Sequence, residues 1–205
     1  GRESGREVFA FYPQESLATL RHRRAGGGPQ PLHYGVDGTP VVLKLDRNGD
    51  GTLDHTAGDE AYVFFGLRRG GSRYFALDIS DPAVVPRLLW TLGTASVGDF
   101  AELGLTFSTP LVGKVNYRGE PEDVLVFGGG YDGGWNATGT ARRGKDLGAA
   151  DDAVGNALYI VNARSGELVW KAVRGDTGNS SDKHFAHAAL TDSIPSEVAA
   201  LRSPQ

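Results

Sequence analysis

The chain has 205 residues, of which 40% are hydrophobic, so it is long enough and apolar enough to bury a core. Its 21 basic and 25 acidic residues give a net charge of -4 and no broad basic surface, and we exclude nucleic acid as a partner. No apolar run approaches the roughly 18 residues of a membrane span, and the lack of cysteine excludes disulfides, thiol nucleophiles and cysteine-ligated metals.

The first 34 residues are expected to hold a leading strand, a short surface helix at 15–21 and a glycine-rich loop. The chain begins GRESGREVFAFYP, with neither an initiator Met nor a signal-peptide pattern. We therefore expect it to be part of a longer precursor.

From residue 35 onward, short apolar runs alternate with Gly, Asp and Asn turns, which predicts strands. Two groups of four runs match each other: each group opens on Thr-Pro, its second run contains Phe-Gly, and it closes on a run that contains Trp. The runs lie at 38–46, 61–70, 72–80 and 87–93, and at 108–116, 123–130, 156–164 and 167–173. Four strands per repeat is typical of a propeller blade.

The predicted fold is all-β: a partial β-propeller of quinoprotein-like, four-stranded antiparallel blades that form an incomplete ring. One blade is expected at 35–93, a second at 94–175 with a long exposed loop at 131–155, and the truncated start of a third at 176–205. Because an open ring leaves unpaired strand edges, we expect further blades in the longer protein. The alternative is a self-contained β-sandwich whose halves are similar by accident.

The connection between the first two runs has oxygen-bearing residues at every second position and a glycine after the third. An EF-hand calcium loop takes ligands from its positions 1, 3, 5, 7 and 9, and its glycine at position 6 allows a sharp turn. The predicted Ca²⁺ ligands are Asp46, Asn48, Asp50, the backbone carbonyl of Thr52, and Asp54. Repulsion among these carboxylates favours a bound cation, since Arg47, at an even position, is expected to point away.

Position 12, where an EF-hand has a bidentate glutamate, is Ala57 in this chain. Either Asp54 binds through both oxygens, or Asp59 or Glu60 completes the shell. We expect weak affinity, on the order of 10⁻⁵–10⁻³ M, and selectivity against Mg²⁺. The alternative is a metal-free turn rich in Asp and Asn.

Eight segments occur in a characteristic order over about residues 5–198. They are GREVFAFYP, HYGVDGTPVV, LDRNGDGTLD, YFALDISDP with LLW, FAELGLTFSTPLVGKV, VLVFGGGYD, GNALYIVNARSGELVW and SIPSEV. Together they resemble the C-terminal propeller domain of the PilY/PilC family, bacterial proteins of type IV pilus biogenesis and pilus-tip adhesion. The chain departs from the family pattern after SIPSEV and lacks the family's large N-terminal region.

The resemblance implies a calcium-binding module whose occupancy regulates pilus extension and retraction (twitching) and surface adhesion. It also implies an extracellular location, at the pilus tip or outer membrane of a bacterium, and Asp46, Asn48, Asp50 and Asp54 as the calcium ligands. The implied partners are pilin, minor pilins and host surface receptors.

The alternative function is a domain of a pyrroloquinoline-quinone-dependent dehydrogenase, whose repeat the YFALDISDP and IVNARSGELVW segments also resemble. Those enzymes enclose a quinone and a metal between several blades, often beside a vicinal disulfide, whereas this chain has no cysteine and no third complete blade. It also has no HExxH, GxSxG or P-loop motif. We therefore predict that it is not an enzyme.

A separate candidate is Arg174-Gly175-Asp176, the tripeptide that host integrins recognise. Gly-Asp directly after the last strand of a blade is ordinary turn chemistry. We favour a turn and keep integrin recognition as the alternative.

Overall fold

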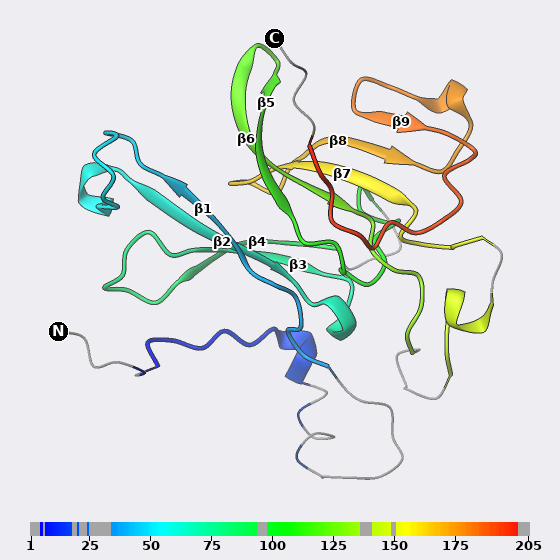
Figure 1. Cartoon of the computed structure of the whole chain (residues 1–205), viewed down its shortest axis with the longest axis horizontal. Coiled ribbons are helices and arrows are strands. Elements are labelled where there is room, and N and C mark those ends of the chain that lie inside the picture. The colour runs from blue at the N-terminus through cyan, green and yellow to red at the C-terminus, as the bar shows by residue number, and fades with distance from the viewer. Residues whose placement is uncertain are drawn as a thin grey trace.

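The computed structural model describes residues 5, 7–17, 20, 24, 34–93, 98–135, 141–148 and 151–200, and its strands form two sheets (Figure 1). The first sheet has strand order β1-β2-β3-β4 and the second has order β5-β6-β7-β8-β9. The strands are β1 (Val41–Leu45), β2 (Glu60–Gly66), β3 (Tyr74–Asp78), β4 (Arg87–Leu92), β5 (Leu111–Tyr117), β6 (Glu120–Gly128), β7 (Ala157–Asn162), β8 (Leu168–Val173) and β9 (His184–Ala186). The 3₁₀ turns are η1 (Gln14–Ser16), η2 (His55–Ala57), η3 (Arg68–Gly70), η4 (Gly144–Leu147) and η5 (Thr177–Asn179). The all-β prediction is confirmed, and each predicted run overlaps one strand.

The two sheets repeat the same pairing. In each sheet the first four strands pair antiparallel with their neighbours in chain order. Trp90 in β4 lies opposite Ala76, just before a register shift in β3. Trp170 in β8 lies opposite Ile160, again just before a register shift, in β7. The two tryptophans therefore occupy equivalent positions in the fourth strands, as the repeat predicts.

The core lies between the two sheets, because one face of each sheet is apolar. The Tyr74 and Phe127 rings, from β3 and β6, approach to 4.4 Å between centroids. Trp90 stacks on Phe64 and donates its indole N–H to the carbonyl of Ala163, which follows β7, at 3.0 Å. These contacts hold the first sheet against the second, and neither sheet closes on itself. A propeller needs more blades than these two sheets, so the partial propeller stays a prediction.

The opposite face of the first sheet carries a smaller apolar cluster, whose buried members are Phe65, Leu67, Phe75 and Leu77. Phe11, in the predicted leading strand, packs edge-on against Phe65 and Phe75, although residues 7–13 form no regular strand. Where the surface helix is predicted, the structure has η1 followed by helical backbone at Leu17 and Leu20, and residues 18, 19 and 21 of that prediction lie outside the described residues. The N-terminal segment thus covers this face with side chains.

The second sheet has a fifth strand that the sequence did not indicate. β9 pairs parallel with β8, so the regular elements in the described part of 176–205 are η5 and this sheet strand. The exposed loop predicted at 131–155 is wrong at both ends: Asp132 and Asp152 are buried, and Asp132 accepts the N–H of Ala153 at 2.8 Å. In the part of the chain that the structure describes, no helix is long and apolar enough to cross a bilayer.

Candidate metal centre

The predicted calcium loop connects β1 to β2, at the far left of Figure 1. The first predicted ligand, Asp46, follows β1 directly and accepts two backbone N–H groups, from Gly49 at 2.6 Å and from Gly51 at 2.7 Å. Both glycines have left-handed φ values, 73° and 81°, which side chains other than glycine rarely adopt. The glycines therefore let the backbone fold around the Asp46 carboxylate.

Asn48 and Asp50 continue the same curl. The Asn48 side chain accepts the N–H of Asp50 at 3.0 Å and donates to its carboxylate at 2.9 Å. Asp50 in turn accepts the N–H of Thr52 at 2.7 Å. An ionised carboxylate offers about four lone-pair positions, so these hydrogen bonds leave oxygen capacity for a cation. The structure thus brings Asp46, Asn48 and Asp50 together on one tight turn.

Asp54 is placed differently from the sequence prediction. Its carboxylate accepts the backbone N–H and the hydroxyl of Thr56, at 2.9 and 2.7 Å, and Asp54 is thus the N-cap of η2. The side-chain hydrogen bond from Thr56 lowers the pKa of Asp54 below its ordinary value. Among the described residues, no three acidic or histidine side chains gather closely enough to hold a metal ion. The five predicted ligands are therefore not assembled into one shell.

The donor set nevertheless fits calcium. Carboxylates, an amide oxygen and a backbone carbonyl are the hard oxygen ligands that Ca²⁺ prefers, and a flexible loop suits its variable geometry. In the structure the Asp54 carboxylate is engaged by Thr56 instead of facing the other predicted ligands, and it would have to release Thr56 to bind a cation.

Asp59, which the sequence offered as a completing ligand, has a different role. It is only 3% exposed. One carboxylate oxygen accepts the N–H of Arg47 at 2.8 Å and the other accepts the N–H of Asp54 at 2.9 Å. Asp59 therefore joins the beginning of the loop to its end.

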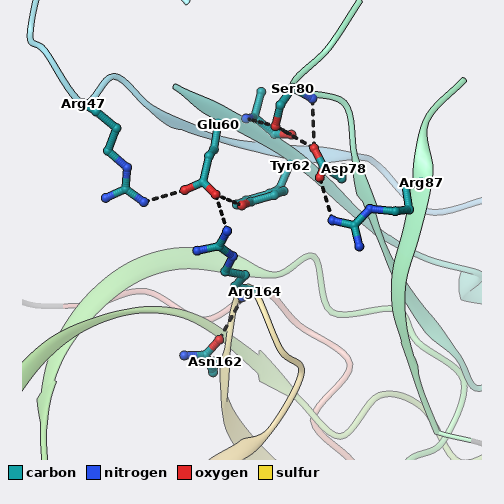
Figure 2. A network of polar contacts seen from close by, with 9 residues as sticks. Arg47, Glu60, Tyr62, Asp78, Ser80, Arg87, Asn162 and Arg164 are labelled. Carbon is teal, nitrogen blue, oxygen red and sulfur yellow. Dashed lines mark hydrogen bonds and ion pairs between the residues drawn. The ribbon is translucent and has the colours of Figure 1, made fainter. Parts of the chain in front are cut away.

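Glu60, the other completing ligand that the sequence offered, faces two arginines instead (Figure 2). Arg47, within the loop, reaches one carboxylate oxygen at 2.5 Å, and Arg164, from the β7–β8 turn of the second sheet, reaches the other at 2.5 Å. The Tyr62 hydroxyl also donates to Glu60, at 2.6 Å. Both oxygens of Glu60 are thus engaged, and the carboxylate connects the loop to the second sheet.

The electrostatics of this group follow from its partners. Burial alone would raise the pKa of Glu60, but the hydrogen bonds from Tyr62 and Arg47 and the charge of Arg164 lower it below its ordinary value. Burial and the bond to Glu60 raise the pKa of Tyr62 to about 12. Glu60 therefore stays ionised and Tyr62 stays neutral at physiological pH.

A cavity of about 490 Å³ opens beside the loop, between η2 and the β3–β4 connection. Its polar groups already have partners: His55 lies 3.4 Å from Asp81. Arg87 lies 3.0 Å from Asp78, which also accepts the Ser80 hydroxyl (Figure 2). Because these partners satisfy one another, the cavity adds no ligands to the loop.

The Arg174-Gly175-Asp176 tripeptide follows β8 and leads into η5. The Arg174 guanidinium pairs with Asp151 at 2.7 Å, and the carbonyl of Asp176 accepts the N–H of Asn179 at 2.9 Å. The tripeptide thus lies in a turn whose arginine already has an acidic partner, and integrin recognition stays a prediction.

Comparison with known proteins finds no family model that matches the chain. Two type IV pilus biogenesis factors named PilY1, from Pseudomonas aeruginosa strains PAO1 and PAK, are each 35% identical to it over 130 residues, which is 62% of this chain and 10% of each relative. The chain is a relative of PilY1. A PilY1 homolog from Xylella fastidiosa strain Temecula1 is 32% identical over 114 residues, or 55% of this chain and 8% of that protein.

The crystal structure of the Pseudomonas aeruginosa PilY1 C-terminal domain also matches, with a TM-score of 0.49 and 25% identity over 86% of this chain and 28% of that one. The sequence relatives confirm the resemblance to the PilY/PilC family that the sequence segments indicate. The matched regions cover about a tenth of the length of the PilY1 relatives.

Proposed function

We propose that the chain is a calcium-binding module of a type IV pilus biogenesis and tip adhesin protein, and that calcium occupancy regulates pilus extension, retraction and surface adhesion. The observation that carries the proposal is the Asp46 carboxylate, which Gly49 and Gly51 hold at the centre of an acidic loop in a relative of PilY1. The module acts at the bacterial surface or pilus tip, with pilin, minor pilins and host surface receptors as partners.

The proposed ligands are Asp46, Asn48, Asp50, the carbonyl of Thr52, and Asp54. Bound calcium supplies positive charge that offsets the clustered carboxylates. The residues around the loop connect the calcium site to the second sheet. Asp59 holds the backbone of both Arg47 and Asp54, and the Arg47 side chain shares Glu60 with Arg164 of the second sheet. Movement of Asp54 would therefore bear on Arg47 and, through Glu60, on the second sheet.

We also infer that the two sheets are neighbouring blades of a larger propeller. The face of the first sheet that contains Ala76 and Trp90 packs on the second sheet. By strand pairing, the equivalent residues of the second sheet are Ile160 and Trp170, which are half-buried and lie on the face turned away from the first sheet. A repeat of the same packing would cover them with a third blade.

Calorimetric titration with Ca²⁺ tests the calcium proposal. The wild type should bind with a dissociation constant on the order of 10⁻⁵–10⁻³ M and should respond weakly to Mg²⁺. The double variant Asp46→Ala, Asp50→Ala should lose the heat, whereas Asp182→Ala, at an exposed carboxylate outside the loop, should retain it. Unchanged heat in the double variant, or no heat from the wild type at millimolar calcium, contradicts the proposal.

A further inference from the structure

A second cavity, of about 220 Å³, lies where the end of β2 meets the segments that lead into β1 and β5. Its wall includes Arg68, the first residue of η3, with Phe107 and Glu197. The hydroxyl-bearing residues Thr39, Thr109 and Ser196 also line it. This cavity is separate from the calcium loop, and nothing described above uses it.

The backbone of Arg68 is held in an unusual conformation. Its φ is 52°, in the left-handed region that residues other than glycine rarely adopt. The Thr106 hydroxyl accepts the N–H of Arg68 at 3.1 Å and that of Leu67 at 2.9 Å. Thr106 is 2% exposed, so this anchor is fixed in the core. Strained residues that the surrounding structure holds in place are common at ligand sites.

The Arg68 side chain is positioned but unpaired. Its guanidinium lies over the Phe107 ring, 5.2 Å from the centroid. Its Nε–H is buried, and the described part of the chain offers this donor no hydrogen-bond acceptor. Its neighbours differ, since Arg69 pairs with Asp37 at 3.6 Å and Arg73 pairs with Glu15 at 3.2 Å. A buried donor without an acceptor is costly, and within the described residues no ion pair engages this guanidinium, so its charge stays available to an anion in the cavity.

Arg118 shows which of these features matter. It also has a positive φ, 55°, and it also lies over a ring, that of Tyr117, at 5.0 Å. However, Arg118 is exposed and forms a two-residue hairpin turn with Gly119, which accounts for its backbone. A positive φ and an aromatic contact are therefore not enough to indicate a site. Arg68 differs from Arg118 by its cavity and its buried, unpaired Nε–H.

The geometry points to a binding site for the carboxylate of an organic monoanion of about amino-acid size, with Arg68 as the cation that binds it. A guanidinium matches a planar carboxylate through two parallel hydrogen bonds. Glu197, also in the wall, repels anions, which favours a single negative charge over a phosphate dianion. The cavity is smaller than the roughly 300–1,000 Å³ of sites for drug-sized ligands, so the ligand is small. The hydroxyls of Thr39, Thr109 and Ser196 are available to its remaining polar groups.

The probe is N-acetylglycine, and its matched neutral control is N-acetylglycinamide. In an NMR titration of the 205-residue chain, N-acetylglycine should shift the Arg68 Nε–Hε resonance in a saturable way. The amide should leave the resonance in place, and inorganic phosphate should bind more weakly. Equal shifts with the amide, tighter binding of phosphate, or no shift with any probe would overturn the assignment.

Three variants separate the guanidinium from the turn. Binding to the variants is followed by the backbone N–H resonance of Phe107 in the cavity wall. Arg68→Gly removes the side chain and suits the positive φ, and it should weaken binding by roughly tenfold or more. Arg68→Lys keeps the charge without the planar fork and should bind with intermediate affinity. Arg118→Gly makes the same change at a similar backbone position and should bind N-acetylglycine like the wild type. If Arg68→Gly does not fold, Arg68→Lys decides, and wild-type affinity in either Arg68 variant refutes the site.

Discussion

The connections between the first two strands of the two sheets differ greatly, although they join equivalent strands. In the first sheet, residues 46–59 separate the pair Leu45 and Glu60. In the second sheet, the two-residue turn Arg118-Gly119 separates the pair Tyr117 and Glu120, with φ values of 55° and 89°. The same strand pairing accepts either a 14-residue or a two-residue connection. The acidic residues are therefore a feature of the long loop and are not needed for the strands to pair.

The two equivalent tryptophans offer the same contrast within the framework. Trp90 is 8% exposed because the second sheet covers it, whereas Trp170 is half-buried. Residues at equivalent positions of the repeat therefore differ in burial, and we expect their mutation to have different effects on stability.

The largest expected effect comes from Trp90→Ala, because it empties the interface between the sheets and removes the hydrogen bond to Ala163. We expect it to lower the free energy of unfolding by about 3–5 kcal/mol. Trp170→Ala should cost less than about 2 kcal/mol, because less of its surface is buried. Urea unfolding followed by circular dichroism measures both free energies. Equal losses would contradict the prediction that Trp90 is more important because the second sheet covers it.

The second effect concerns the internal brace of the long connection. Asp59→Asn should lower the free energy of unfolding by about 2 kcal/mol, because an amide nitrogen would face the N–H of either Arg47 or Asp54. The short β5–β6 turn needs no such brace. Asp182→Asn, at an exposed carboxylate, should change stability by less than about 0.5 kcal/mol. Both are measured by thermal unfolding in EDTA, and the prediction fails if the two variants melt together.

The smallest effect compares Glu60 and Glu120, the first residues of β2 and β6. Glu60→Gln should lower the free energy of unfolding at pH 7 by about 1 kcal/mol, because it weakens the pairing with Arg47 and Arg164. Glu120→Gln, at an exposed residue, should have an effect close to zero.

The pH dependence gives a further measure of Glu60. Folding lowers its pKa below the ordinary value of 4.5, so the ionised carboxylate favours the folded state. This contribution is fully present above that value and is lost as the pH falls through the lower folded-state pKa. The difference between wild type and Glu60→Gln should therefore shrink as the pH falls below about 4.5. A difference that stays constant between pH 7 and pH 3 would show that charge is not involved.

The framework could be predicted because its signals are local. Alternating apolar residues located the strands, and the matched positions of Trp90 and Trp170 gave their equivalence. The oxygen-bearing spacing at 46–54 likewise located the acidic loop without any knowledge of its surroundings.

The contacts around the loop could not be predicted, because they depend on how distant segments meet. Nothing near Glu60 in the sequence indicates Arg164, which reaches it only because the β7–β8 turn packs beside the first sheet. An aspartate can bind either a cation or backbone N–H groups, and the sequence does not distinguish the two. Only the burial of Asp59 and its hydrogen bonds in the structure show which role it has. The capping of η2 by Asp54 did leave a local signal, an Asp two residues before Thr56.

β9 has a further consequence, for association between chains. By pairing with the last three residues of β8, Lys171 to Val173, it covers that half of the strand's outer edge, where another chain could otherwise add a strand. Within the described residues, the outer edge of β4 has no such cover, and Leu88 on this strand is 48% exposed. Unwanted edge-to-edge pairing would therefore start more readily at β4 than at the covered half of β8. The charge of Arg87 at the start of β4, and the six-residue length of the strand, oppose that pairing.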